Sequence, residues 1–174
     1  MVEDRIDCLP NYDPYLGDFR LHLVENSKTL VGKPEKRMAG YSETPLIKKL
    51  GIKPENRVAL VNAPKGFKQE LGPLPAKAKY RSSTSEALDF ILVFVKSLHE
   101  LASQFAPFAV NLSRNGMIWV AWPKKSSGVA TDLSFDNVQR TGLDAGLVDV
   151  KICAINDIWS GLKFVYRLKD RVPR

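Results

Sequence analysis

The apolar run DFILVFV at residues 89–95 is the feature that most constrains how this chain can fold. Its apolar positions are consecutive and do not alternate with polar ones, which is typical of a central parallel strand covered on both faces. Ser97 follows as a candidate helix cap. Apolar residues then recur at helical spacing past Pro107, which we expect to kink or split the helix, as far as a stop at Asn115-Gly116.

Shorter apolar runs indicate further strands on both sides of this one. We expect them at residues 58–61, 78–82, 117–122, 148–155 and 162–168, the second of them at an edge. The last two follow one another through a turn at 156–161 with no helix between them. One strand of that pair is therefore expected to run antiparallel.

Helix signals separate most of these strands. Thr44 is positioned to cap a short helix that Gly51 stops, and residues 67–71 form at most another short helix. Ser134 begins a further helix that Gly146 ends. Strands that alternate with helices in this way predict a three-layer α/β fold with a mixed sheet.

The first 38 residues differ in character from the rest. They carry six Lys/Arg and seven Asp/Glu, a net charge of −1, whereas residues 39–174 carry 20 and 12, a net charge of +8. We expect an N-terminal extension at 1–38, able to build a homodimer, and one α/β domain at 39–174. A basic domain favours anionic small molecules, acidic protein surfaces or nucleic acid as partners.

Composition also excludes several classes of protein. No apolar run approaches the roughly 20 residues that a membrane span needs, and the start MVEDRIDCLP lacks the apolar core of a signal peptide. Two cysteines are too few for a disulfide framework, and no Cys/His cluster has metal-ligand spacing. We expect a cytoplasmic protein without a metal.

The order of elements resembles the Rossmann-like fold of S-adenosylmethionine-dependent methyltransferases. The stretch LGIKPENRVAL at 50–60 resembles the lead-in to their first strand, and the last third of the chain, with its terminal hairpin, resembles their fourth strand onward. The resemblance implies a truncated methyltransferase-like core that ends in an antiparallel strand. It is a resemblance of fold, and a fold does not determine a function.

A second resemblance covers residues 39 to about 170. The motifs GYSETPL at 40–46, LGPLP at 71–75 and WPKKSSG at 122–128 together resemble an uncharacterised bacterial family, one of the domains of unknown function. That family implies no activity.

The loop after the first strand argues against the methyltransferase cofactor. Such folds place a Gly-x-Gly loop there, so that the backbone approaches the ligand closely. Residues 62–66 instead read NAPKG, in which Ala63 and Pro64 add bulk, and no carboxylate ends the strand. The region that would hold a ribose-binding acid, residues 78–83, is basic. We therefore expect no cofactor, and in particular no S-adenosylmethionine.

Ligands of open α/β sheets bind at the carboxyl ends of the parallel strands. Three loops, at 62–66, 96–99 and 123–128, are expected at that edge, each with lysine, and the turn 156–161 adds an aromatic wall. Ammonium, hydroxyl and backbone N–H groups suit an anion. The candidate ligand-binding residues are Asn62, Lys65, Gly66, Lys96, Ser97, Lys124, Lys125, Ser126, Ser127, Gly128 and Trp159.

An alternative is equally open: Lys124 and Lys125 form a solvated turn and the tryptophans belong to the core. Catalytic residues are not identifiable. His99, Ser126 or Ser127, and Asp132 are conceivable as a base, nucleophile and acid, but no spacing demands this.

The leading hypothesis is a non-catalytic module that binds an anionic ligand or partner at the basic carboxyl edge. Enzymatic activity is open and not favoured. One alternative is a transferase that acts on a phosphorylated or nucleotide-containing substrate through the same loops. Another is a structural dimer or interaction protein.

Overall fold

The computed structural model describes residues 44–82 and 87–172 of the chain, which form a six-stranded mixed sheet. The predicted extension at 1–38 lies outside these residues. The strands stand in the order β2-β1-β3-β4-β6-β5. Their bounds are Arg57–Val61 (β1), Lys79–Tyr80 (β2), Leu88–Phe94 (β3), Leu112–Pro123 (β4), Leu147–Ala154 (β5) and Trp159–Tyr166 (β6). Strands β2, β1, β3 and β4 are parallel, and β6 runs antiparallel to both β4 and β5.

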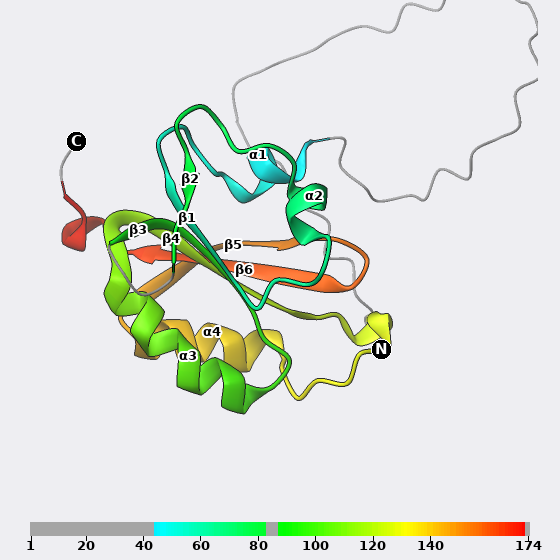
Figure 1. The fold of residues 1–174 in the computed structure, drawn as a ribbon. Helices are drawn as coiled ribbons and strands as arrows, with labels where there is room; N and C mark the ends of the chain where they lie inside the picture. Colours follow the sequence, from blue (N-terminus) through cyan, green and yellow to red (C-terminus); the bar gives the residue numbers. More distant parts are fainter. Residues whose placement is uncertain (1–43, 83–86, 173–174) are drawn as a thin grey trace, which may run out of the picture.

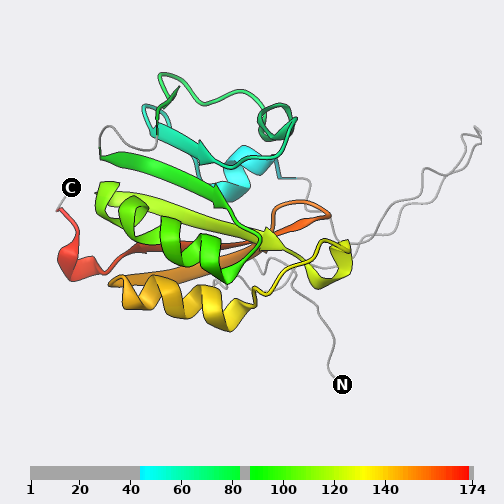
Figure 2. The same cartoon turned by 60° about the horizontal axis from the view of Figure 1, so that its bottom comes forward.

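Helices cover both faces of this sheet. Helices α3 and α4 lie side by side on one face, and α1 and α2 lie on the other (Figure 1, Figure 2). Their bounds are Leu46–Leu50 (α1), Phe67–Leu71 (α2), Leu98–Asn111 (α3) and Phe135–Asp144 (α4), and short 3-10 turns occupy Lys125–Ser127 (η1) and Leu168–Asp170 (η2). The prediction of a three-layer α/β fold with an antiparallel strand near the end is confirmed. Among the described residues, no helix is long and apolar enough to cross a membrane.

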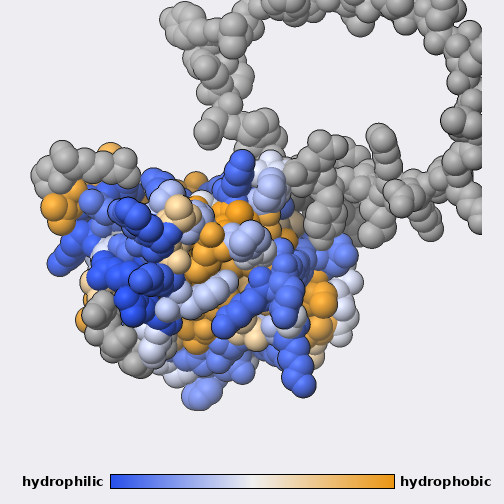
Figure 3. Space-filling view, turned by 45° about the horizontal axis from the view of Figure 1, so that its top comes forward, coloured by the Kyte–Doolittle hydropathy of each residue, from blue (hydrophilic) through white to orange (hydrophobic). Residues whose placement is uncertain are grey.

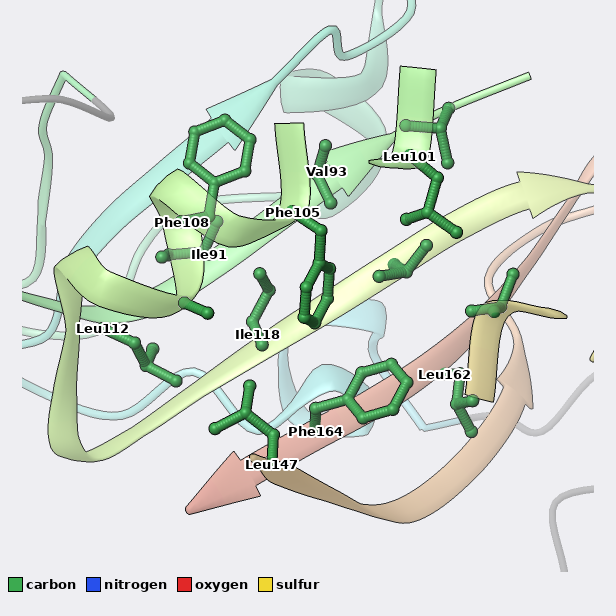
Figure 4. Packing of buried hydrophobic residues seen from close by; sticks show 14 of the residues in the cluster. Ile91, Val93, Leu101, Phe105, Phe108, Leu112, Ile118, Leu147, Leu162 and Phe164 are labelled. Atoms are coloured by element: carbon green, nitrogen blue, oxygen red, sulfur yellow. The ribbon is translucent and has the colours of Figure 1, made fainter. Parts of the chain in front are cut away.

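The core between the sheet and α3/α4 is built by apolar residues at alternate strand positions and on one face of each helix (Figure 4). Phe105 of α3 meets Phe164 of β6 edge to face, with ring centroids 5.6 Å apart. Gly142 of α4 lies over the same ring, because a Cβ at this position would come within 2.1 Å of Phe164 Cε1. The glycine therefore allows α4 to approach the sheet closely.

The opposite face has a second core beneath α1 and α2. Trp119 of β4 is fully buried there, and its Nε1 donates a hydrogen bond of 3.0 Å to the Leu50 carbonyl at the end of α1. Phe94 of β3 packs edge-on between Phe67 of α2 and Trp159 of β6. Figure 3 views this face and shows hydrophobic side chains gathered toward its middle among hydrophilic ones.

The prediction for the helix after Ser97 was wrong at its end. Helix α3 continues through Pro107 and stops at Asn111, and residues 112–116 already belong to β4. Pro107 lies on the exposed side, where water can satisfy the carbonyl that loses its partner. Gly116 does not end the helix. It allows β4 to lie close to β3, since a Cβ at this position would come within 2.8 Å of the Leu88 carbonyl.

The predicted ends of the other helices were closer to the observed ones. Gly51 ends α1 in the left-handed region at φ 83°, but the residue before the helix is Pro45, so Thr44 does not occupy the cap position. Ser134 begins α4 with reciprocal bonds to Asn137, a capping box. Gly146 follows that helix at φ 82°.

Candidate functional site

The carboxyl ends of β1, β3 and β4 meet at one edge of the sheet. Val61 pairs with Val93, and Phe94 pairs with Ala121, so the three strands end nearly level. The β5–β6 turn reaches the same edge, because the Lys124 N–H donates a hydrogen bond of 2.7 Å to the Ile158 carbonyl. The structure therefore brings together the loops whose residues were predicted as ligand-binding candidates.

The strand order reverses direction between β1 and β3. From β1 the chain crosses through α2 to β2 on one side, and from β3 it crosses through α3 to β4 on the other. The loop after β1 and the loop after β3 leave toward opposite faces of the sheet (Figure 1). In open α/β sheets such a switch point forms a crevice outside the strand ends, and it is the usual place for a ligand.

Asn62 and Gly66 define the loop on the β1 side of the switch point. Asn62 has a left-handed backbone, φ 53°, and its amide donates to the Gln104 side chain at 3.0 Å and to the Phe94 carbonyl at 3.4 Å. Gly66 is also left-handed, φ 82°, and nothing lies within 4 Å of where its Cβ would be. Lys65 between them is exposed.

Lys96 and Ser97 follow β3 at the start of α3, where protein side chains already satisfy the backbone N–H groups. The Ser97 hydroxyl accepts from Glu100 N at 3.2 Å, and the Glu100 carboxylate accepts from Lys96 N at 2.7 Å. Asp132 accepts from Leu98 N at 2.7 Å. Sequence reasoning missed Glu100 here, although the spacing Ser-x-x-Glu is the signal of a capping box.

The turn that contains WPKKSSG also satisfies its own polar groups. Ser127 donates through its hydroxyl to the Lys124 carbonyl at 2.7 Å and accepts from Val129 N at 3.3 Å. Gly128 allows the turn through its left-handed backbone, φ 71°. The side chains of Lys125 and Ser126 remain exposed.

The tryptophans do not form an aromatic wall. Trp122 and Trp159 are each only 6% exposed and belong to the two cores. Trp159 and Ser160 were expected in a turn, but β6 begins at Trp159. The indole of Trp159 lies edge-on against Phe94 at 5.0 Å, so its rings pack inward.

No acid–base constellation forms from the residues considered earlier. His99 is exposed, and within the described residues it bonds to neither Ser126 nor Ser127, while Asp132 is engaged with Leu98. No group of three or more metal-ligating side chains occurs in the described part of the chain either.

Large apolar side chains accompany the lysines at the carboxyl edge. Leu98 opens α3, Phe135 opens α4 and Ile158 lies in the β5–β6 turn, and they are 42%, 37% and 42% exposed. The edge thus combines exposed cations with exposed apolar surface, a mixture that suits a ligand with both charged and flat apolar parts.

A shallow pocket lies at the opposite edge of the sheet. It measures about 280 Å³ and is lined by Ala106, Ala109, Val110, Ala145 and Tyr166. Its one side-chain polar group, the Tyr166 hydroxyl, already donates to the Ala109 carbonyl at 2.9 Å. This pocket offers no chemistry, and the candidate site remains the carboxyl edge.

Comparison with known proteins gives no sequence relatives. No family model matches the chain, and no curated protein matches its sequence. The resemblance to an uncharacterised bacterial family therefore stays a prediction.

Solved structures with a similar fold include methyltransferases. A SAM-dependent methyltransferase from Aquifex aeolicus is 16% identical, with a TM-score of 0.49 over 68% of this chain and 86% of that one. Fibrillarin from Aeropyrum pernix, with natively bound S-adenosyl-L-methionine, is 14% identical, with a TM-score of 0.48 over 72% and 70%. Magnesium protoporphyrin IX methyltransferase from Synechocystis, with bound SAM, is 9% identical, with a TM-score of 0.48 over 70% and 74%. At these identities the likeness concerns the fold.

These neighbours correct two predictions made from the sequence. The non-catalytic binding module and the absence of S-adenosylmethionine are both contradicted, because the three structures above are methyltransferases and two of them hold that cofactor. Both predictions rested on the missing Gly-x-Gly loop. In the structure Gly66 has a left-handed backbone, and nothing lies within 4 Å of where its Cβ would be.

Proposed function

We propose that this domain is a transferase that binds a nucleoside-containing ligand at the switch point between β1 and β3. The observation that carries the proposal is the reversal of strand order there, with Asn62–Gly66 leaving β1 toward one face and residues 95–97 leaving β3 toward the other. S-adenosylmethionine is the first ligand to test.

The residues at the switch point suit several parts of such a ligand. Lys65 and Lys96 are exposed cations that can pair with a carboxylate or a phosphate. The open backbone at Gly66 allows close approach. The Asn62 amide nitrogen and the Ser97 hydroxyl oxygen are engaged within the protein, so the groups they can offer to sugar hydroxyls are the Asn62 amide oxygen and the Ser97 hydroxyl hydrogen. When bound, S-adenosylmethionine supplies an electrophilic methyl group, and the role of these residues is to bind and orient the ligand that carries it.

The rest of the carboxyl edge suits the acceptor substrate. Lys124 lies beside the β5–β6 turn through its bond to the Ile158 carbonyl, Lys125 follows it, and the Ile158 side chain is exposed. Cations next to flat apolar surface favour an acceptor that combines a phosphate with a ring, as nucleotides do. The acceptor class we propose is therefore phosphorylated or nucleotide-containing.

Calorimetric titration of the full chain with S-adenosylmethionine, S-adenosylhomocysteine, ATP and adenosine tests the first part of this proposal. Gly66→Val fills the open space at the switch point and is expected to weaken binding by about tenfold or more, or about 1.4 kcal/mol. Gly146→Val is the matched control, because it introduces the same side chain at another left-handed glycine with open space around it, in the connection between α4 and β5.

Two results would count against the proposal. One is no measurable binding of any of the four ligands. The other is an equal loss of affinity in Gly66→Val and Gly146→Val, which would place the ligand away from the switch point.

A further inference from the structure

Two lysines stand opposite one another on the α1 side of the sheet. Lys151 of β5 and Lys163 of β6 are direct partners in the antiparallel ladder, so their side chains emerge on the same face. Like charges at such positions destabilise a sheet. This pairing is therefore a cost to the fold that the local structure does not explain.

The C-terminal end of α1 brings these lysines to one place. Lys151 Nζ donates to the Lys49 carbonyl at 3.3 Å, and Lys163 Nζ lies 4.0 Å from the position that a Cβ on Gly51 would take. Lys53 follows Gly51 by two residues. We call Lys53, Lys151 and Lys163 the α1-face lysines.

No carboxylate among the described residues pairs with the α1-face lysines. The ion pairs among the described residues join Arg57 to Asp89 and Lys77 to Glu55. The nearest acid along β5, Asp149, accepts a hydrogen bond from Gln139 of α4 on the opposite face.

Burial and the clustering of cations lower the pKa of Lys163. This lysine is half-buried beside the fully buried Trp119, its partner in the β4–β6 ladder. Burial first, and then the charges of Lys151, Lys53 and Arg171, lower its pKa below the ordinary value for lysine. A partly desolvated ammonium among other cations is stabilised by an anion that sits between them.

We propose that the α1-face lysines form a binding site for a phosphate-bearing ligand, separate from the carboxyl edge. A phosphate group carries close to two negative charges and several acceptor oxygens, so it can pair with more than one ammonium at once. A single carboxylate neutralises only one. The site rests on residues within β5, β6 and the α1–β1 connection, and it is independent of the proposed transferase site.

Titration of the full chain with inorganic tripolyphosphate, followed by calorimetry, tests this site with a probe that has no base or sugar. Lys151→Gln/Lys163→Gln is expected to weaken binding by about tenfold or more. Lys77→Gln/Lys79→Gln removes the same net charge from exposed lysines at β2, at the other edge of the sheet from β5, and is the matched control, with a change below about twofold. Equal losses in the two double variants would overturn the proposal.

A second measurement uses the unmodified protein, in case the variants fold poorly. In NMR spectra of the side-chain ammonium groups, tripolyphosphate is expected to shift the Lys163 and Lys151 signals ahead of those of Lys77 and Lys79. Absence of binding by the full chain, or shifts confined to other lysines, contradicts the site. Lys151→Gln/Lys163→Gln should leave the binding of S-adenosylmethionine unchanged, so failure of this proposal and failure of the transferase proposal give different results.

Discussion

The carboxylate of Asp132 accepts a hydrogen bond of 2.7 Å from the backbone N–H of Leu98, the first residue of α3. This bond ties the loop after β4 to the helix after β3. Asn62 makes the equivalent link from the β1 loop to the end of β3, and the Lys124 N–H links β4 to the β5–β6 turn. Hydrogen bonds thus join adjacent loops at the carboxyl edge. They fix the positions of the candidate ligand-binding residues on different loops relative to one another.

Asp132→Ala is expected to lower the free energy of unfolding by about 1 kcal/mol, because a backbone N–H in the first turn of α3 loses its acceptor. Urea unfolding at neutral pH measures the change. Asp144→Ala is the control: Asp144 lies at the C-terminal end of α4, where a negative charge is unfavourable, so its removal should not destabilise the protein. An equal loss in both variants would show that the bond to Leu98 contributes nothing specific.

The surroundings of Asp89 predict that part of the free energy of unfolding is lost in acid. Burial acts to raise its pKa, but hydrogen bonds from the Arg57 side chain and backbone and from Ser113, with the charge of Arg57, outweigh it and hold the pKa below the usual value. A lowered folded pKa means stability that is present above the unfolded pKa, about 4, and is lost as the pH falls through the folded value.

Denaturation at a series of pH values between neutral and strongly acidic checks this sign. Asp89→Asn should be less stable than the unmodified chain at neutral pH, by about 1 kcal/mol, with the gap closing in acid. A gap that widens as the pH falls would mean that the pKa of Asp89 is raised and not lowered.

Gly142→Ala is expected to destabilise the fold although alanine is the better helix former by about 1 kcal/mol. A Cβ would come within 2.1 Å of Phe164, so the ring or helix α4 must move, at about 1–3 kcal/mol or more. Combining it with Phe164→Leu should recover part of the loss, which a double-mutant cycle of unfolding free energies measures. Strict additivity of the two changes would contradict the contact.

Trp159→Ala is expected to lower the free energy of unfolding by about 3 kcal/mol or more, since a buried indole that packs on Phe94 is removed. Its neighbour Ile158 is 42% exposed, so Ile158→Ala should change stability far less. Thermal or urea unfolding compares the two variants. A small effect at Trp159 would revive the hypothesis that this ring faces a ligand.

Several elements follow from local patterns, and these were predicted well. The run at 89–95 became β3 because an uninterrupted apolar stretch is stable only where both faces are covered. Ser134 began α4 and Gly51 ended α1 because capping and left-handed turns depend on residues close in sequence. The weak strand at 78–82 appeared as the short edge strand β2.

The misplaced features depend on contacts across the fold. Pro107 and Asn115-Gly116 carry strong local signals, yet the apolar side of α3 holds the helix past the proline, and Gly116 packs against the backbone of β3. Trp159 was placed in a turn because nothing near it in sequence shows that its ring packs against Phe94.

The sequence by itself determined the α/β class, the central strand, the antiparallel end and the loops that meet at the carboxyl edge, since apolar periodicity and capping act over a few residues. Only the tertiary structure decided which polar groups remain available there. Glu100 and Asp132 occupy the start of α3, while Lys53, Lys151 and Lys163 gather without a carboxylate among the described residues. Hydrogen bonds and charges act through space, and residues 34 apart, such as Leu98 and Asp132, become partners only when strands set the loops beside one another.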